Sequence, residues 1–414
     1  MPADPRAVTT VREGSEVPPR VLGLDVGAVE AVWTAVERLY ASGVHPAIQL
    51  CVRYRGAVLL DRAIGHAVGA GPDDPPGTPA LRCTPDTPFV LFSACKPVTA
   101  MLVHLLDERN LIRLDDPVCE YIPEFGTHGK QWITIRHVLT HRAGIPNLPS
   151  EAMTPEVLAD SAAVLRLLCE ARPVWRPGRE LAYHAVSGGF ILGELIRRVS
   201  GKDPRLLLDE LLRRPLGCRF FTYGLAPEDL PLLARSYATG PRPPLPIALL
   251  MRRALGRSLE EVTAASNEPP FHAALIPSGN LVATADEMSR FYQLLLDGGR
   301  FGDVRVFDRR TVRRATCEQS YFEMDFTLVV PIRYAIGFML GAEWFSLYGP
   351  YTPRAFGHIG FTNIVCWADP ERSLAAALMT SGKPIVYPEL YWLWEILRRI
   401  GAACPRERGR SIPG

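Results

Sequence analysis

The stretch Ser93-Ala94-Cys95-Lys96-Pro97 places a serine and a lysine three positions apart at the predicted start of a helix over residues 93–109. Proline is tolerated in the first turn of a helix but breaks its interior, so Pro97 marks where this helix begins. Side chains three positions apart lie on one helical face, with Cβ atoms about 5–6 Å apart. The pattern therefore predicts that Ser93 and Lys96 meet at a helix N-terminus.

A helix N-terminus favours a reactive serine. Its free N–H groups and the positive end of the helix dipole stabilise an alkoxide or a developing oxyanion. A lysine in a closed site loses its proton more readily than in water, because burial disfavours its charged form. Lys96 is thus predicted to help activate Ser93, although a helix cap followed by a surface lysine has the same sequence.

Two further elements bring groups suited to such a site. Tyr183 stands where a predicted loop meets a helix over 187–199, and its hydroxyl either acts there as a general base or packs beneath the helices. A predicted strand opens with Gly357-His358-Ile359-Gly360-Phe361. Its glycines let a ligand approach the backbone closely, and a free N–H on this strand is expected to complete an oxyanion hole. His358 is either a substrate-facing group or a structural histidine.

The spacing of apolar residues predicts strands near both ends of the chain and helices between them. The predicted strands are 47–54 and 57–63, joined by Arg55-Gly56, and 356–368 and 373–380, which turn at 369–371. A loop is expected over 69–79. The predicted helices are 26–42, 135–141, 155–170, 187–199, 203–212, 285–296 and 388–400.

This order predicts an α+β fold, in which an antiparallel sheet flanked by helices receives an inserted all-helical lobe. The sheet lobe is expected over 23–85 and 276–405 and the helical lobe over 86–275, with flexible arms at 1–22 and 406–414. The active site is predicted between the lobes, where ligand sites commonly form.

Taken together, these motifs resemble the β-lactamase-related serine hydrolases, which include class C β-lactamases, DD-peptidases and esterases, and the similarity spans roughly residues 47–400. Ser93 and Lys96 match the family's nucleophile and lysine, Tyr183 opens its Y-x-N motif, and His358-Ile359-Gly360 matches its K-T-G element in a histidine form. Residues 139–144 and 277–281 resemble its framework motifs. The resemblance implies a β-lactamase/transpeptidase-like fold.

Two departures from the family pattern point to the substrate. Ala185 replaces the asparagine that penicillin-cleaving members usually carry, and His358 replaces the lysine expected to hold a substrate carboxylate. Both changes favour an ester or thioester of a neutral or hydrophobic acid. Residues 241–255 are interpreted either as an apolar wall over the cleft or as a plain helix of the lobe.

The resemblance implies acyl transfer through an acyl-enzyme on Ser93, with Lys96 and Tyr183 moving the proton. The N–H groups of Ser93 and Phe361 are expected to hold the oxyanion, with His358, Ile359 and Gly360 on the same binding strand. No metal or organic cofactor is required. We expect a carboxylesterase of lipase-like type; the alternatives are an acyltransferase, a β-lactamase or DD-peptidase, and a non-catalytic homologue. An α/β-hydrolase would need a G-x-S-x-G elbow, which the sequence lacks.

Composition and charge favour a small molecule as the partner of this protein. Of the 414 residues, 47% are hydrophobic and 22% charged, and the net charge of +2 gives no reason to expect nucleic acid as a partner. The nine cysteines form no C-x-x-C pair, which disfavours a disulfide framework or a zinc site. No segment reaches the roughly 18 continuous apolar residues of a membrane span. A cytoplasmic location is expected, and the oligomeric state is left open.

Overall fold

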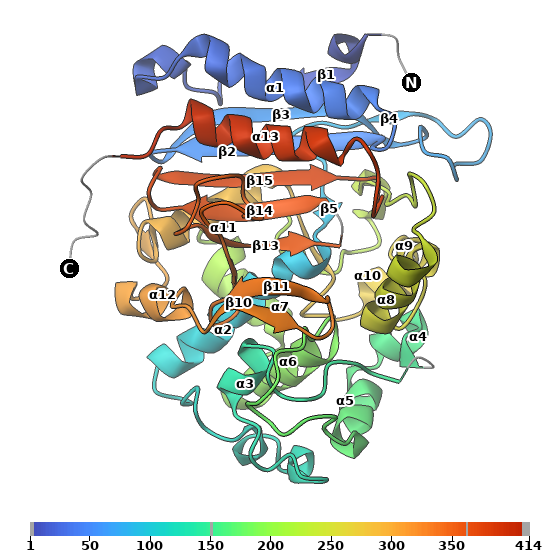
Figure 1. Cartoon of the computed structure of the whole chain (residues 1–414), viewed down its shortest axis with the longest axis vertical. Helices are drawn as coiled ribbons and strands as arrows, with labels where there is room; N and C mark the ends of the chain where they lie inside the picture. Colours follow the sequence, from blue (N-terminus) through green and yellow to red (C-terminus); the bar gives the residue numbers. More distant parts are fainter. Residues whose placement is uncertain (1–3, 150–151, 362, 408–414) are drawn as a thin grey trace.

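The computed structural model describes residues 4–149, 152–361 and 363–407, and both ends of the chain contribute to one large antiparallel sheet (Figure 1). Its strands follow the order β1-β3-β2-β15-β14-β13-β12-β11-β10, and β4 pairs with β3. These strands are β1 (Thr9–Val11), β2 (Ala47–Tyr54), β3 (Ala57–Val68), β4 (Leu81–Arg82), β10 (Ser320–Asp325), β11 (Val330–Tyr334), β12 (Met339–Leu340), β13 (Phe356–Gly360), β14 (Ile364–Asp369) and β15 (Leu374–Thr380). Strands from the two ends therefore meet where β2 pairs with β15.

Helices cover both faces of this sheet. On one face α1 (Val26–Ala41) packs beside α13 (Leu390–Ala403), and on the other α11 (Ala285–Leu296) packs against β14 and β15 (Figure 1). Along β15, Leu374, Ala376 and Leu378 belong to the core beneath α1 and α13, whereas Ala375, Ala377 and Met379 belong to the core on the opposite side. Because successive strand residues face opposite sides, a strand covered on both faces is apolar throughout.

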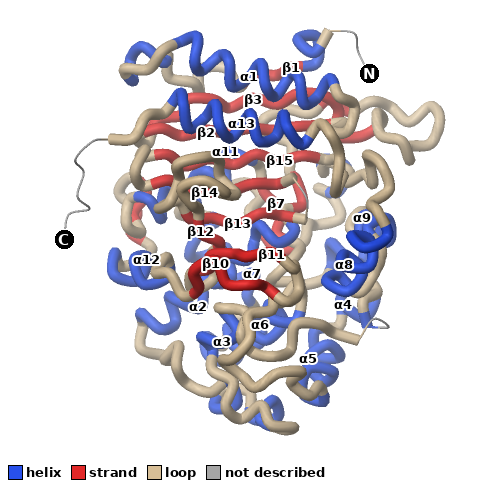
Figure 2. Tube along the Cα trace, viewed as in Figure 1, coloured by secondary structure: helices blue, strands red, loops and turns tan. Residues whose placement is uncertain are grey.

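The middle of the chain consists of helices joined by long loops, drawn in blue and tan in Figure 2. Its helices are α2 (Lys96–Glu108), α3 (Ile135–Leu139), α4 (Pro155–Ala159), α5 (Ser161–Glu170), α6 (Ser187–Ser200), α7 (Pro204–Leu208), α8 (Leu245–Leu255), α9 (Leu259–Ala265) and α10 (Pro269–Ala273). A three-stranded sheet is formed by the short strands β5 (Phe89–Val90), β6 (Thr222–Tyr223) and β7 (Leu281–Ala283). Later in the chain come the paired strands β8 (Arg300–Phe301) and β9 (Val304–Arg305) and the helix α12 (Arg309–Ala315).

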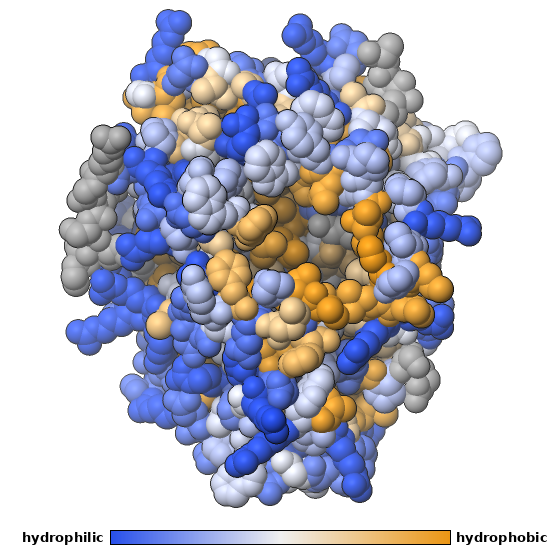
Figure 3. Space-filling view, viewed as in Figure 1, coloured by the Kyte–Doolittle hydropathy of each residue, from blue (hydrophilic) through white to orange (hydrophobic). Residues whose placement is uncertain are grey.

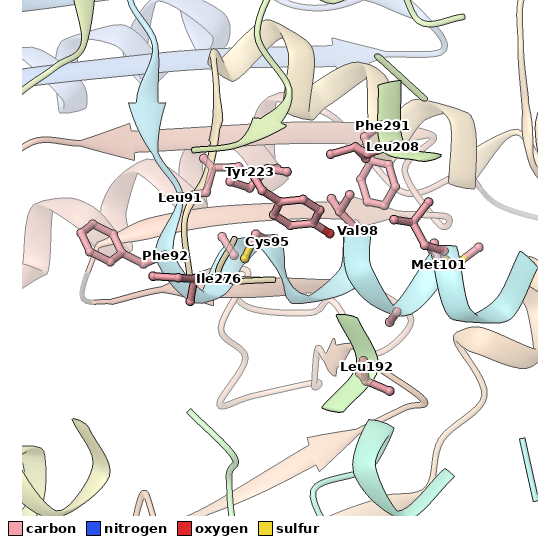
Figure 4. Packing of buried hydrophobic residues seen from close by; sticks show 14 of the residues in the cluster. Leu91, Phe92, Cys95, Val98, Met101, Leu192, Leu208, Tyr223, Ile276 and Phe291 are labelled. Carbon is pink, nitrogen blue, oxygen red and sulfur yellow. The ribbon is translucent and has the colours of Figure 1, made fainter. Parts of the chain in front are cut away.

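The start of α2 is anchored in the largest hydrophobic core. Figure 4 shows Tyr223 lying along α2 beside Cys95 and Val98. The Tyr223 hydroxyl lies 2.6 Å from Thr99 Oγ1, and Thr99 donates to the Pro277 carbonyl at 2.5 Å. The helix that begins with Lys96, three residues after Ser93, is therefore held by two segments distant in the sequence.

Many predicted elements are confirmed. Strand 47–54, helix 285–296 and the start of helix 26–42 agree with β2, α11 and α1, and Thr284 caps α11 as part of a capping box. Arg55 and Gly56 have φ values of 52° and 83°, which suit the tight turn of a two-residue hairpin.

Four predictions need correction. Residues 9–11, expected within a flexible arm, form β1 and pair with β3, and Arg12 Nε lies 2.6 Å from Asp61 Oδ2. The predicted strand over 356–368 is two strands that pair with each other, and Phe361, which follows the first, has a φ of 44°, outside the range of extended backbone. Helix 155–170 breaks at Asp160, which has a ψ of 87° and caps α5. Helix 203–212 changes at Leu208 into a π-helical turn. Of the two arms predicted to be flexible, 1–22 and 406–414, residues 1–3 and 408–414 lie outside the described residues.

Candidate active site

Ser93 lies in a short 3-10 helix, η3 (Phe92–Cys95), immediately before α2. Phe92 has a φ of 48°, a backbone conformation that costs energy for a bulky residue and is found mainly at functional sites. Strand β13 passes close by: a Cβ on Gly360 would lie 2.2 Å from the Leu91 carbonyl oxygen. Glycine at 360 therefore allows the strand to reach the serine turn.

Lys96 lies directly against the serine. Its Nζ is 3.0 Å from Ser93 Oγ, 2.8 Å from the Ala185 carbonyl oxygen and 3.1 Å from the Ser278 carbonyl oxygen. Enclosure by these groups lowers the pKa of Lys96 to about 7, because burial disfavours the ammonium form. The ammonium form donates to Ser93 Oγ and to both carbonyl oxygens. The neutral amine has two N–H bonds, and when it donates these to the two carbonyl oxygens its lone pair is left facing the Ser93 hydroxyl.

Tyr183 completes the group. Lys96 Nζ lies 4.8 Å from the centroid of the buried Tyr183 ring. Burial raises the pKa of the Tyr183 phenol above its ordinary value, and a hydrogen bond with Ser93 opposes this shift to a smaller extent. Tyr183 is therefore a neutral phenol beside the serine, and the lysine is the group that gains or loses its proton near neutral pH.

A buried carboxylate that the sequence analysis missed holds Tyr183 in place. Asp325, at the end of β10, accepts hydrogen bonds through Oδ1 from the N–H groups of Tyr183 (3.1 Å), Thr327 (2.8 Å) and Leu328 (2.9 Å). Its Oδ2 lies 3.2 Å from the Tyr334 hydroxyl. Asp-x-Thr marks a turn in the sequence, but nothing local indicates that this turn binds a residue so far away.

Three neutral histidines surround the lysine and the tyrosine. Burial and the nearby Lys96 lower the pKa of both His184 and His358 to about 3, and burial lowers the pKa of His141 well below its ordinary value. The His141 ring centroid lies 4.8 Å from that of Tyr183, and the His358 centroid lies 6.1 Å from it. None of the three supplies a positive charge at neutral pH.

The tautomer of His358 follows from its surroundings. Its Nδ1 lies 2.7 Å from the Ile359 carbonyl oxygen, so Nδ1 carries the hydrogen and Nε2 is left as an acceptor. Within the residues that the structure describes, the buried Nε2 has no hydrogen-bond partner. The buried His104, His45, His184 and His272 also have unpaired ring nitrogens among the described residues, so this feature is shared by the substrate-facing and the structural interpretation of His358.

The remaining predicted site residues follow His358 along β13. Ile359 packs against the small hydrophobic cluster that contains Tyr183, and Gly360 lies against the serine turn. Phe361 stacks on Phe92 with ring centroids 4.9 Å apart, and its φ is 44°. The structure thus brings both ends of the chain segment 358–361 to the serine and the tyrosine.

A pocket of about 320 Å³ opens beside Ser93, lined by Phe92, Phe361 and Ala185 and by residues of α4, α8, α9 and α10. Figure 3 shows hydrophobic side chains gathered on this face, including over α8 and α9. No cluster of three or more metal-ligating side chains occurs in the described part of the chain. None of the helices described is long and apolar enough to cross a membrane.

This fold and these grouped side chains are those of a serine hydrolase. Residues 34–393 match the Beta-lactamase family, and the chain belongs to that family. It is 31% identical to the "Esterase/beta-lactamase LipL" of Mycobacterium tuberculosis over 98% of this chain and 94% of that protein.

Solved structures of related proteins have the same fold. A family VIII carboxylesterase superposes with a TM-score of 0.75 at 25% identity, covering 89% of this chain and 96% of its own. A penicillin-binding protein homologue from Caulobacter crescentus gives the same TM-score and identity, covering 91% and 97%. The predicted α+β, β-lactamase/transpeptidase-like fold is confirmed.

Proposed function

We propose that the protein hydrolyses carboxylic esters through an acyl-enzyme on Ser93, with Lys96 and Tyr183 as the proton-transfer groups. The proposal depends chiefly on the position of Lys96. Its Nζ lies 3.0 Å from Ser93 Oγ and donates hydrogen bonds to two backbone carbonyl oxygens. An amine held in this way, with a pKa lowered to about 7, is suited to take a proton from a serine.

In the first step, Ser93 Oγ attacks the ester carbonyl carbon as its proton passes to Lys96. The N–H groups of Ser93 and Phe361 stabilise the oxyanion of the tetrahedral intermediate. When the C–O bond to the alcohol breaks, Tyr183 donates its phenolic proton to the leaving oxygen and is reprotonated by the Lys96 ammonium. The neutral phenol described above is the form that such a donor needs.

In the second step, a water molecule attacks the acyl-enzyme carbonyl. The proton of this water passes through Tyr183 to Lys96. The bond between the acyl carbon and Ser93 Oγ then breaks, and Lys96 returns a proton to Ser93 Oγ. The acid leaves, and the enzyme returns to its starting state. If an alcohol takes the place of water, the same site performs acyl transfer, so the hydrolase and transferase alternatives share one mechanism.

An ester fits this site better than a β-lactam or a peptidoglycan peptide. A penicillin carboxylate needs a cation, whereas His358 has a pKa of about 3 and is neutral. Ala185 offers no side-chain amide. The name of the family VIII carboxylesterase supports an esterase, while the name of the esterase/beta-lactamase LipL covers both activities. The nine free thiols support a reducing, cytoplasmic setting.

The test combines labelling with kinetics on p-nitrophenyl butyrate. A fluorophosphonate probe should modify Ser93 in the folded protein, and Ser93→Ala should abolish both labelling and turnover. Tyr183→Phe should lower kcat about 10²- to 10⁴-fold, the usual effect of losing a general acid-base group. The control, Tyr321→Phe at a tyrosine that is 71% exposed, should leave turnover unchanged. Full turnover in Ser93→Ala would exclude the proposed nucleophile, and faster turnover of nitrocefin than of esters would favour a β-lactamase.

A further inference from the structure

The pocket beside Ser93 has an apolar interior. Its wall includes Met153, Leu158, Leu255, Val262, Phe271 and Ile276. Its volume of about 320 Å³ lies at the small end of the range of about 300–1,000 Å³ for small-molecule sites. The pocket therefore suits an uncharged group of moderate size.

The charged side chains that line this pocket are unsuited to binding an anion. Arg257 Nη1 lies 3.4 Å from Glu261 Oε1, and Arg257 Nε donates to the Met153 carbonyl at 3.1 Å. Glu156 and Glu261 are exposed to solvent. The lining contains one arginine and two glutamates, so its net charge is negative and a carboxylate on the bound group would be disfavoured.

The arrangement of catalytic groups indicates which half of an ester occupies this pocket. The leaving alcohol must lie near Tyr183 and Lys96 to receive a proton, and neither of these residues lines the pocket. Ser93 and Phe92 do line it, and so does Phe361, the residue proposed to supply the second N–H for the oxyanion. The carbonyl carbon carries only one further substituent, which is the acyl chain.

We therefore propose that this pocket is the acyl subsite and that it selects esters of neutral, apolar acids of moderate length. This inference depends on the proposed function, since it assigns the two halves of an ester to two sides of Ser93. Of residues 241–255, Leu255, the last residue of α8, belongs to the pocket lining, while Leu245 and Leu249 of the same helix lie outside it and are 71% and 59% exposed.

Ala185 contributes to this specificity through its size. It lines the pocket, and its carbonyl oxygen binds Lys96, so its backbone cannot move away without disturbing the lysine. A longer polar side chain at position 185 would enter the pocket beside Ser93. The small side chain at this position therefore widens the acyl subsite.

The first test is a series of p-nitrophenyl esters from acetate to dodecanoate. The value of kcat/KM should rise about three- to fourfold for each added methylene, the usual gain from burying one, until the pocket is filled, and fall for dodecanoate. The p-nitrophenyl ester of succinic acid, whose acyl group carries a carboxylate, should react at least about tenfold more slowly than the butyrate. Equal rates for succinate and butyrate would overturn the assignment of a neutral acyl group.

The second test fills the pocket with Val262→Phe. This variant should hydrolyse the acetate within about twofold of the unmodified protein but lose at least about tenfold in kcat/KM on the hexanoate, a loss of the size expected for excluding a few methylenes. Leu249→Phe, on the exposed side of α8, should behave as the unmodified protein. Ala265→Val, a milder change in the same wall, covers the case in which the phenylalanine variant does not fold.

A series of acetate esters that differ only in the alcohol separates the remaining outcomes. If Val262→Phe impairs long alcohols and spares long acyl chains, the pocket binds the alcohol and the subsite assignment is wrong. If the unmodified protein hydrolyses no ester and Ser93 is not labelled by fluorophosphonate, the proposed function itself fails. Labelling and acetate hydrolysis without any chain-length effect of Val262→Phe would refute the subsite alone.

Discussion

Within the group formed by Ser93, Lys96 and Tyr183, Lys96 is the residue whose protonation state changes in the range where enzymes work. Burial lowers its pKa to about 7, whereas an exposed lysine stays charged up to about pH 10.4. If the neutral amine takes the proton of Ser93, the reaction needs the deprotonated form, which predominates above pH 7.

We therefore expect kcat/KM for p-nitrophenyl acetate to rise with pH through an apparent pKa near 7 and to level off above it. Lys96→Arg should lower kcat/KM by about 10²- to 10⁴-fold, since a guanidinium does not lose its proton. Lys202→Arg, at an exposed lysine paired with Glu210, is the matched control and should leave the pH profile unchanged. A rate that stays constant down to pH 5 would contradict the role of the neutral amine.

Among the elements, the β10–β11 hairpin connects the edge of the sheet to the site. Asp325 ends β10 and accepts the backbone N–H of Tyr183, and Tyr334 of β11 lies against the same carboxylate. In the proposed mechanism the hairpin acts on the reaction through Tyr183, so we propose Asp325 as a positioning residue.

Asp325→Ala should lower kcat by at least about tenfold and change KM by less than about twofold, because a misplaced catalytic group slows chemistry more than binding. Asp325→Asn keeps an oxygen acceptor for the Tyr183 N–H and should recover much of the lost rate. Asp303→Ala, at an exposed aspartate, is the control. An unchanged kcat in Asp325→Ala, measured on protein with a normal unfolding temperature, would show that Tyr183 does not need this anchor.

For the whole molecule, buried histidines make stability depend on pH. Burial lowers the pKa of five of them to about 3 or 4: His45, His104, His184, His272 and His358. In the unfolded chain these groups bind protons near pH 6.5, while the folded protein keeps them neutral. Between about pH 6.5 and 4 the unfolded state therefore binds more protons, and stability is lost as the pH falls.

The unfolding temperature should accordingly decrease steeply from pH 7 to pH 4.5, as followed by circular dichroism. Asp61 acts in the opposite direction, because burial raises its pKa to about 6 and the folded state then binds the extra proton. Burial also raises the pKa of Glu287, Asp297 and Asp325, and these four carboxylates together offset only part of the effect of the five histidines. An unfolding temperature that is higher at pH 5 than at pH 7 would contradict this balance.

The meeting of Ser93 and Lys96 could be predicted from the sequence because it depends on neighbours three positions apart and on the proline that starts α2. The same holds for the β2–β3 hairpin and for α11, whose turn and cap residues act locally. The family motifs added Tyr183 and His358, and the comparisons confirm the family and the fold. The two-lobe division and the catalytic roles of these residues stay predictions.

Other features depend on contacts between distant parts of the chain. Asp325 meets Tyr183, the carbonyls of Ala185 and Ser278 orient Lys96, and four short helices form the wall of the pocket. The left-handed turn at Phe361, which divides one predicted strand into two, is adopted by a residue that ordinarily favours a strand. Local preferences extend over a few residues, whereas these contacts form only when the sheet and the helices pack together. For that reason the reactive pair could be predicted from a five-residue stretch, but the carbonyls that orient its lysine and the pocket beside its serine required the folded chain.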